Sequence, residues 1–183
     1  MNRKFPESYY TRVIESILTQ KEELKNAVSP ETILTDTLKL LSTCLHLNRG
    51  RIFLWDESKK SLVIKYSHGL TKAEVSNGKY DVCEGITGEV FDTGKMSLVH
   101  NIMAAQNYLG KVTPRSLLEQ TTVSYIAVPL KHEGYLYGVV AVETIPHYDG
   151  DLEANALVLN LVAEMFADII HHYSICDLDF ECA

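Results

Sequence analysis

The part of the sequence most suggestive of chemistry is the glycine-rich stretch at 84–96, EGITGEVFDTGKM. A phosphate-binding loop of the G-x-x-x-x-G-K-[ST] type needs backbone N–H groups around the phosphates, a Lys, and a hydroxyl that ligates Mg²⁺. Here five residues separate Gly88 from Gly94, and Met96 stands where the hydroxyl is required. The spacing therefore argues against a phosphate-binding loop. We instead expect Gly85 and Gly88 to let a short helix lie close against a sheet, and Gly94 to end that helix in a left-handed conformation.

The histidines and cysteines form no pattern typical of a metal site or a catalytic nucleophile. His132-Glu133 lies in a turn pattern and lacks the second His of H-E-x-x-H. His171 and His172 are adjacent, so on a helix they diverge and cannot chelate one ion as residues spaced i, i+4 can. No C-x-x-C pair occurs among the four cysteines, which are Cys44, Cys83, Cys176 and Cys182. We therefore predict no metal site and no catalytic residue.

Two charged residues are candidates for contact with an anionic ligand. Arg115 is the only Arg after Arg51, and a guanidinium is well suited to bind a carboxylate or phosphate; a solvated loop arginine is the simpler interpretation. Glu143 follows Val139 and Ala141 on one face of an apolar strand. Such a carboxylate lies either at the solvent-exposed end of the strand or in the core with a partner, and we expect the strand end.

Composition and charge limit the classes of function. The 183 residues, 46% apolar and 22% charged, suffice for one domain with a sizeable core. The net charge is −7 and no basic stripe occurs, so we expect no direct contact with nucleic acid. No apolar run approaches the roughly 18 residues that span a bilayer, and no signal-peptide core follows the N-terminal cations. We expect a cytoplasmic protein with no membrane contact.

Three long helices are predicted from apolar residues at helical spacing. The first covers 7–28 and stands apart from the next element, so it must bury its apolar stripe on its own domain or on a second copy of the chain. We favour the second copy, and hence a homodimer through the terminal helices. The next helix begins after the N-cap Ser29, with Pro30 in its first position, and runs to about residue 46. The last covers about 150–173.

Between these helices the period of the apolar residues changes to two, which predicts strands. One hairpin is expected from 51–56 and 61–68, with Leu62, Ile64 and Tyr66 on one face. A second hairpin is expected from 122–131 and 135–144. Hairpins between terminal helices predict an α+β fold. We expect an antiparallel sheet of about six strands, with helices packed on one face and long N- and C-terminal helices.

Three segments in the same order resemble the GAF domain family. GITGEVFDTGK followed by MSLVHNI (85–102) resembles the middle of the family's pattern, RIFLWDESKKSLVIKYSHGL (51–70) resembles its first hairpin, and YIAVPLKHEGYLYGVVAVE (125–143) resembles its paired strands. Within the family, 68–95 and 116–130 are most similar to the N-terminal sensory domains of NifA-, VnfA- and AnfA-type activators that work with sigma-54. The resemblance implies a GAF/PAS-like sheet.

The resemblance also implies a domain organisation and a function. Residues 1–28 would form a dimerisation helix, 29–174 the GAF domain, and 175–183 a linker or tail toward a downstream ATPase module. The domain would be a ligand-responsive regulatory module of a bacterial transcriptional activator of the nitrogen-fixation type, and not an enzyme. Its ligand would be a small metabolite such as 2-oxoglutarate or a nucleotide. Alternatively, a regulatory protein would bind in place of a small molecule. The sequence identifies neither the ligand nor a cofactor.

The fold implied by the resemblance places a ligand between the sheet and the long middle segment. Aromatic core packing is the commoner role for the tyrosines found there. The candidate wall residues are Tyr66, Tyr80, Val82, Ile86, Val99, Asn101, Tyr108, Arg115, Tyr125 and Glu143.

Two other functions occur in the same family. One is a GAF domain that only dimerises or binds a partner protein and has no ligand. The other is a free methionine sulfoxide reductase, whose nucleophilic cysteine lies in a G-x-C-G segment. Here Thr87 stands in the cysteine's place and Cys83 lies two residues before Gly85. The enzyme is therefore the least favoured of the three interpretations.

Overall fold

A six-stranded antiparallel sheet forms the centre of the molecule. In the computed structural model, residues 6–23, 29–114, 116, 122–145 and 152–173 are described. The sheet order is β3-β2-β1-β6-β5-β4, and β1–β2 and β5–β6 are the two predicted hairpins. Pairing of β1 with β6 joins them, with Ile52 opposite Val140. The strands are β1 Asn48–Asp56, β2 Ser61–Ser67, β3 Lys79–Tyr80, β4 Ser97–Val99, β5 Ser124–His132 and β6 Tyr135–Thr144.

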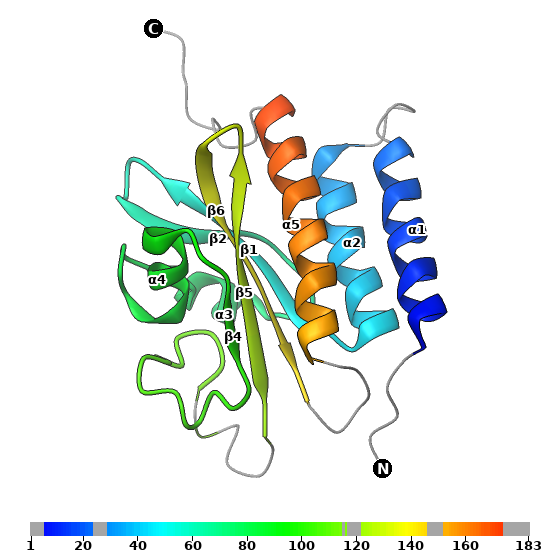
Figure 1. Ribbon diagram of the computed structural model, residues 1–183. Helices are drawn as coiled ribbons and strands as arrows, with labels where there is room; N and C mark the ends of the chain where they lie inside the picture. Colours follow the sequence, from blue (N-terminus) through cyan, green and yellow to red (C-terminus); the bar gives the residue numbers. More distant parts are fainter. Residues whose placement is uncertain (1–5, 24–28, 115, 117–121, 146–151, 174–183) are drawn as a thin grey trace, which may run out of the picture.

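Three long helices lie on one side of the sheet (Figure 1). They are α1 Glu7–Glu23, α2 Pro30–Leu45 and α5 Leu152–Tyr173. The apolar faces of α2 and α5 pack on the sheet around residues such as Leu38 and Phe166, both 0% exposed. The predicted N-cap is confirmed, because the Ser29 hydroxyl accepts the Thr32 N–H at 3.3 Å.

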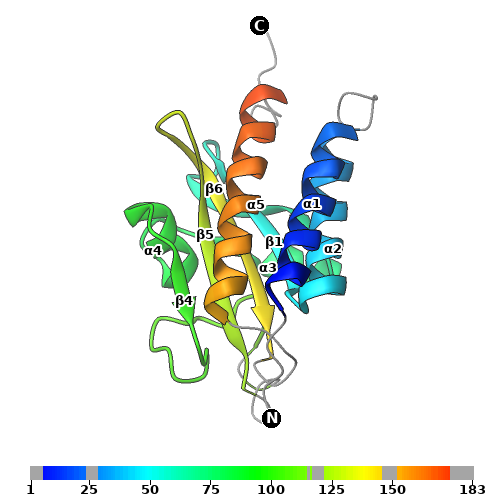
Figure 2. The same cartoon turned by 45° about the vertical axis from the view of Figure 1, so that its right-hand side comes forward.

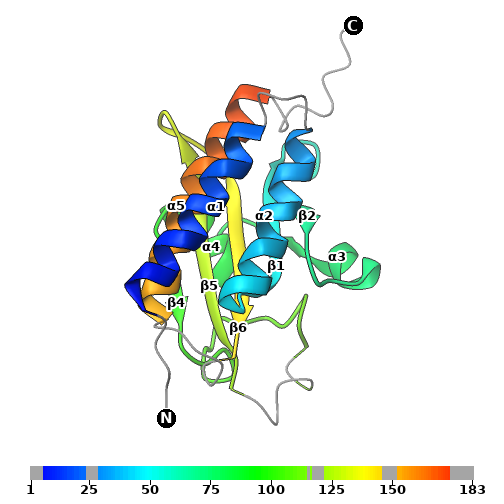
Figure 3. The ribbon, with the colours of Figure 1, turned by 90° about the vertical axis from the view of Figure 1, so that its right-hand side faces the viewer.

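Helix α1 packs against α2 and α5 of its own chain (Figures 2 and 3). Val13 and Ile17 are each only 4% exposed and belong to the core beneath these helices. We expected a second copy of the chain to cover the apolar side of this helix. For Val13 and Ile17 that expectation is wrong, because helices of the same chain cover them. The helix still presents Leu18, 54% exposed, to the outside, so dimerisation itself remains a prediction. The predicted residues 24–28 of the helix lie outside the described residues.

The opposite face of the sheet carries two short helices, α3 Lys72–Asn77 and α4 Gly85–Thr93, together with the segment that follows β4. Helix α3 is stabilised at its N-terminus by a capping box that Thr71 and Glu74 make. A second apolar core lies between these elements and the sheet. The α+β prediction is therefore confirmed, with the addition that both faces of the sheet are covered.

The glycines of α4 act as predicted at one end of the helix and differently at the other. Gly94 has φ +59° and donates its N–H to the Val90 carbonyl at 2.9 Å, which is the expected left-handed end. At Gly88 a Cβ would lie 2.3 Å from the carbonyl oxygen of Asp81. Gly88 thus permits contact with the loop before the helix, and not with the sheet as predicted.

A β-bulge in β2 corrects the predicted face of one tyrosine. Ile52 pairs with Tyr66 and Phe53 with Ile64, so Lys65 is an extra residue that reverses the alternation of side chains. Leu62 and Ile64 lie in the core under α3 and α4, as expected. Tyr66 instead packs on the core under the long helices.

Among the described residues, α5 alone is long and apolar enough to cross a membrane by length and composition. However, 61% of its most apolar window is buried inside the protein. Met165, Phe166 and Ile169 pack in the core beneath the long helices. Its apolar character is therefore accounted for by its place against the sheet.

Candidate functional site

Strand β1 brings two arginines to the face of the sheet that α3 and α4 cover. Alternation along the strand puts Arg49 and Arg51 on the same face. A register shift between Asn48 and Arg51 interrupts the pairing with β6, and Arg49 adopts φ +52° there. Since Glu143 of β6 pairs with Asn48 across this irregularity, both guanidinium groups reach its carboxylate.

Arg51 and Glu143 form a buried ion pair. Their exposed fractions are 1% and 3%, and Arg51 Nη1 lies 2.8 Å from Glu143 Oε1. Arg51 also donates to the Arg49 carbonyl at 2.9 Å, while its Nε has no hydrogen-bond partner among the described residues. Burial disfavours the charged guanidinium, but neighbouring Tyr125 and Glu143 outweigh burial and raise the pKa of Arg51. Arg51 therefore stays charged and Glu143 compensates it.

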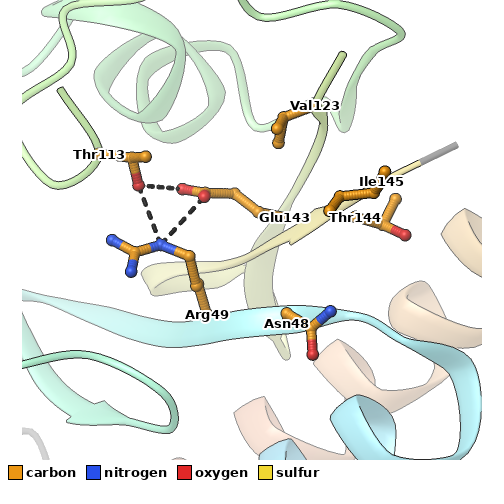
Figure 4. Close-up of a pocket in the computed structure, with 7 residues that line it drawn as sticks. All are labelled: Asn48, Arg49, Thr113, Val123, Glu143, Thr144 and Ile145. Carbon is orange, nitrogen blue, oxygen red and sulfur yellow. Dashed lines mark hydrogen bonds and ion pairs between the residues drawn. The ribbon is translucent and has the colours of Figure 1, made fainter. Parts of the chain in front are cut away.

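Arg49 connects this ion pair to Thr113 and to α3, and Figure 4 shows its contacts with Glu143 and Thr113. Its Nε lies 3.1 Å from both Glu143 Oε2 and the Thr113 hydroxyl, and its Nη2 lies 2.8 Å from Glu74 Oε1 of α3. Thr113 in turn donates to Glu143 Oε1 at 2.7 Å. We call Arg49, Arg51, Thr113 and Glu143 the arginine–glutamate cluster.

A cavity of about 250 Å³ opens beside this cluster, at the start of β1 and the end of β6 (Figure 4). Its volume lies just below the roughly 300–1,000 Å³ of pockets for drug-sized ligands, so it suits a small metabolite better than a nucleotide. Arg49 supplies the positive charge at its wall. The lining residues are Asn48, Arg49, Thr113, Val123, Glu143, Thr144 and Ile145.

Three buried tyrosines, Tyr80, Tyr108 and Tyr125, lie on the inner side of the cluster. The Arg51 guanidinium carbon lies 5.0 Å from the centroid of the Tyr125 ring. The Tyr125 hydroxyl lies 3.0 Å from the Thr87 hydroxyl, and the Tyr108 hydroxyl donates to the Thr113 carbonyl at 2.7 Å. Burial, followed by the charge of Glu143, raises the pKa of Tyr108 to about 12. Tyr108 is thus a neutral core residue whose hydrogen bond to the Thr113 carbonyl helps to hold the cluster in place.

The structure brings together five of the predicted wall residues. Tyr80, Tyr108, Tyr125 and Ile86 lie in the core under α3 and α4, and Tyr125 pairs with Glu143 across β5 and β6. Val99, named with them, packs on the same core. Of the predicted wall residues that the structure describes, Glu143 is the one that lines the cavity.

The remaining predicted residues lie elsewhere. Tyr66 is on the other side of the sheet, and Val82 is 40% exposed. Asn101 is half-buried, and its side chain accepts the Met103 N–H at 2.9 Å within a turn. Arg115 lies outside the described residues.

The structure also corrects the expected position of Glu143 and adds three residues to the site. The preferred position of Glu143 at a solvent-exposed strand end is wrong, because the cluster buries it with partners. Sequence reasoning also missed Arg49, Arg51 and Thr113. The signal for the arginines was present, since R-G-R at 49–51 places two cations on one face of an otherwise apolar strand.

Cys83, the candidate thiol of the enzyme interpretation, is exposed. Its hydrogen bond with Asp92, and then burial and the charges of Asp92 and Glu89, raise the pKa of the thiol. A raised pKa lowers the fraction of reactive thiolate. Cys83 is therefore not activated as a nucleophile in this conformation.

Comparison with known proteins agrees with this architecture. A family model described as GAF domain matches residues 29–170. The chain is 28% identical over 166 residues to the nitrogen fixation protein AnfA of Azotobacter vinelandii, covering 91% of this chain and 30% of AnfA. It is 25% identical over 147 residues to the Nif-specific regulatory protein of Azospirillum brasilense, covering 77% of this chain and 23% of that protein.

A solved structure supports the fold. The GAF domain of A. Aeolicus nlh2 in an inactive state superposes with a TM-score of 0.74 and 22% identity, covering 90% of this chain and 99% of that one. The chain described here belongs to the GAF domain family. Within that family it is homologous to part of the regulators of nitrogen fixation. It spans less than a third of the length of either of these relatives.

Proposed function

We propose that this chain is a ligand-responsive regulatory domain of a bacterial transcriptional activator of the nitrogen-fixation type, and that it senses a small anionic metabolite. The proposal rests chiefly on Arg49, whose guanidinium lies at the wall of a cavity of metabolite size. A relative that covers most of this chain is described as a Nif-specific regulatory protein. Such a domain works in the cytoplasm and catalyses no reaction.

The arginine–glutamate cluster offers a way to detect the ligand. A carboxylate that enters the cavity competes with Glu143 for Arg49, because both are anions and the contact between Arg49 Nε and Glu143 Oε2 is 3.1 Å long. Arg49 also binds Glu74 of α3. A shift of Arg49 therefore moves α3 and the segment at Thr113 relative to the sheet. The ligand then favours one of two arrangements by its differential affinity for them.

The same proposal includes a domain organisation and a downstream module that the sensory domain regulates. Residues 1–28 serve as a dimerisation helix, 29–174 as the sensory domain, and 175–183 as the connection to an ATPase module. The support is the fraction of each relative that the chain covers, which leaves most of their length for other modules. The gene sequence beyond the codon for residue 183 tests this part: an ATPase module is expected, and a kinase module there would contradict it.

Thermal unfolding with added ligands tests the sensor. 2-Oxoglutarate is expected to raise the melting temperature of the chain, and ATP to raise it less, because the cavity is small. At a ligand concentration of 100 times Kd the stabilisation would be about 2.7 kcal/mol. Arg49→Ala should abolish the shift. Glu74→Gln is the matched control, since it removes the outer partner of Arg49 and leaves the cavity wall unchanged.

Two outcomes would contradict the proposal. The first is an unchanged melting temperature with 2-oxoglutarate, other dicarboxylates and nucleotides alike. The second is an equal shift for the wild type and Arg49→Ala, which would place the ligand elsewhere.

A second function, dimerisation through the terminal helices, is favoured by apolar side chains on their outer surface. Leu157 and Leu161 are one turn apart on α5 and are 66% and 49% exposed, and Leu18 of α1 is 54% exposed. Exposed leucines at this spacing are suited to helix–helix contact between two copies.

Sedimentation equilibrium tests the dimer. The wild type is expected to be dimeric, and the double variant Leu157→Glu/Leu161→Glu monomeric. Leu109→Glu is the control, because Leu109 is also exposed, at 45%, but lies in the segment after β4. A monomeric wild type would exclude this function, as would a dimer that survives the double variant.

A further inference from the structure

Three histidines from two distant parts of the chain meet at one end of the molecule. His132 is the last residue of β5, and His171 and His172 lie in the last turn of α5. The ring centroid of His132 is 4.6 Å from that of His171 and 5.7 Å from that of His172. This group lies apart from the arginine–glutamate cluster and has no part in the function proposed above.

Asp168 completes a set of ligand atoms with His132 and His172. Its Oδ1 lies 3.9 Å from His132 Nδ1 and 3.2 Å from His172 Nδ1. Ligands of a tetrahedral zinc ion at about 2.0–2.1 Å from the metal are separated by a little over 3 Å, which is close to these distances. His172 Nδ1 also lies 2.9 Å from the backbone carbonyl oxygen of Asp168, so binding of the ion would replace that contact. Asp168 and His172 are spaced i, i+4 and therefore share one face of α5. The ligand atoms of the three residues all lie within 4.8 Å of one another.

We propose that His132, Asp168 and His172 bind a divalent transition-metal ion of the zinc type. Two imidazoles and a carboxylate are ligands that Zn²⁺ accepts, and the hard ions Mg²⁺ and Ca²⁺ prefer oxygen ligands alone. With three protein ligands, the fourth position is open to water or to a further group. This proposal differs from the prediction of no metal site. That prediction considered His171 and His172 separately from His132.

His171 is assigned to the surroundings of this site and not to the ligands. Its Nδ1 shares a 2.5 Å hydrogen bond with the Tyr137 hydroxyl, and its Nε2 faces Glu133 Oε2 at 3.9 Å. His132, Glu133 and His171 also lie close enough to hold an ion. Glu133, however, is 70% exposed in the hairpin turn, whereas Asp168 is 27% exposed on a regular helix. The set with Asp168 is therefore better preorganised.

An ion at this site would join the β5–β6 hairpin to the last turn of α5. His132 belongs to the sheet, and the other two ligands belong to the helix. Because an ion that binds the folded state stabilises it, metal would hold the C-terminal end of α5 against the sheet. The proposal thus predicts that the ion stabilises the end of α5.

Metal binding to the whole chain, with any affinity tag removed and after dialysis against EDTA, tests the proposal. Equilibrium dialysis with ZnCl₂ should show one ion per chain, and Zn²⁺ should raise the melting temperature. Co²⁺ should bind with an absorption spectrum of nitrogen and oxygen ligands, without a thiolate charge-transfer band. The absence of a thiolate band would show that no cysteine binds the ion.

Variants then test the ligand set. His132→Ala and His172→Ala should each weaken Zn²⁺ binding by more than about 10-fold, since residues that merely orient ligands already change affinity by about 10–100-fold. His171→Ala should retain binding within a few-fold. His100→Ala, a change at an exposed histidine far along the chain, is the general control.

The proposal is overturned if the wild-type chain dialysed against EDTA binds no Zn²⁺, if binding survives His132→Ala, or if a thiolate band appears with Co²⁺. Loss of binding in His171→Ala but not in His172→Ala would overturn the assigned ligands in favour of Glu133 and His171. Far-ultraviolet circular dichroism of each variant shows whether the fold is retained, and Asp168→Asn provides a second, less disruptive test of the same site.

Discussion

At the scale of single residues, the arginine–glutamate cluster is governed by the need to compensate a buried charge. Arg51 is 1% exposed, and its guanidinium cannot lose its proton at any ordinary pH. Glu143, 3% exposed, supplies the opposite charge. Removal of one member of such a pair leaves the other buried and uncompensated, which costs more than the pair itself contributes.

Glu143→Ala is therefore expected to lower the free energy of unfolding by about 3–5 kcal/mol. Urea unfolding followed by circular dichroism measures the change. Glu57→Ala, at an exposed carboxylate, should change stability by less than about 0.5 kcal/mol. The double variant Glu143→Leu/Arg51→Leu should recover part of the loss, because it removes both charges. Equal stabilities for Glu143→Ala and Glu57→Ala would contradict this account of the cluster.

Glu74 makes stability depend on pH in the acid range. Its hydrogen bond from the Thr71 N–H, and then its contact with Arg49, lower the pKa of its carboxyl from 4.5 to about 2. A group whose pKa is lower in the folded state binds protons more readily when unfolded. Its contribution is therefore complete above 4.5 and is lost as the pH falls toward about 2.

The expected result is that Glu74→Gln is less stable than the wild type above pH 4.5, and that the difference shrinks as the pH falls toward about 2. Urea unfolding of both proteins across this range measures the difference directly and cancels the titration of other carboxyls. A constant difference at every pH would show that Glu74 acts only through packing.

At the scale of elements, the close approach at Gly88 fixes the position of α4. The loop at Asp81–Cys83 comes so near that a Cβ on residue 88 would lie 2.3 Å from a backbone oxygen. A backbone atom cannot move aside as the end of a flexible side chain can. Helix α4 in turn holds Ile86 and Val90 in the core under α3 and α4.

Gly88→Ala is expected to lower the free energy of unfolding by about 1–3 kcal/mol, the usual range for overpacking. Lys95→Ala, at an exposed position just after α4, is the control and should be nearly neutral. Thermal or urea unfolding provides the comparison. A neutral Gly88→Ala would mean that the loop yields and that the glycine is not required for packing.

At the scale of the whole molecule, the sheet separates two cores, and α1 is the outermost part of one of them. Ile17 is buried against the chain's own helices, whereas its neighbour Leu18 faces outward. The two residues therefore report on different contacts. Ile17 reports on packing within one chain, and Leu18 on contact with a second copy.

Ile17→Ala is expected to lower stability by about 2 kcal/mol or more, as large-to-small changes in a core do. This loss should be the same at every protein concentration. Leu18→Ala should matter only where dimers are populated, so its effect should grow with protein concentration. Unfolding curves at two concentrations measure both. If the loss in Ile17→Ala depends on concentration, α1 packs on a second copy after all.

Much of the fold followed from the sequence because it depends on neighbours in the chain. The N-cap at Ser29 and the left-handed end at Gly94 each involve bonds across three or four residues. The hairpins follow from alternation and short turns. The face of Tyr66 did not follow, because the extra residue at Lys65 shows itself only in pairing with β1.

The candidate site followed only in part. Glu143 was named from its place in an apolar strand, and the buried tyrosines from the fold that the resemblance implies. The partners of Glu143, however, come from β1 and from Thr113. A sequence shows that a carboxylate stands among apolar residues; it does not show which cation lies opposite. The preference for an exposed strand end was wrong for that reason.

By itself, then, the amino-acid sequence determined the kinds and order of the elements, the family, and which side of most strands is apolar. These depend on local hydrogen bonds, backbone preferences and periodicity. Only the tertiary structure decided that Arg49 and Arg51 meet Glu143, that α1 covers its own chain, and that His132 lies beside α5. Those contacts join residues far apart in the chain, and they arise from the register of the strands and the packing of helices on the sheet.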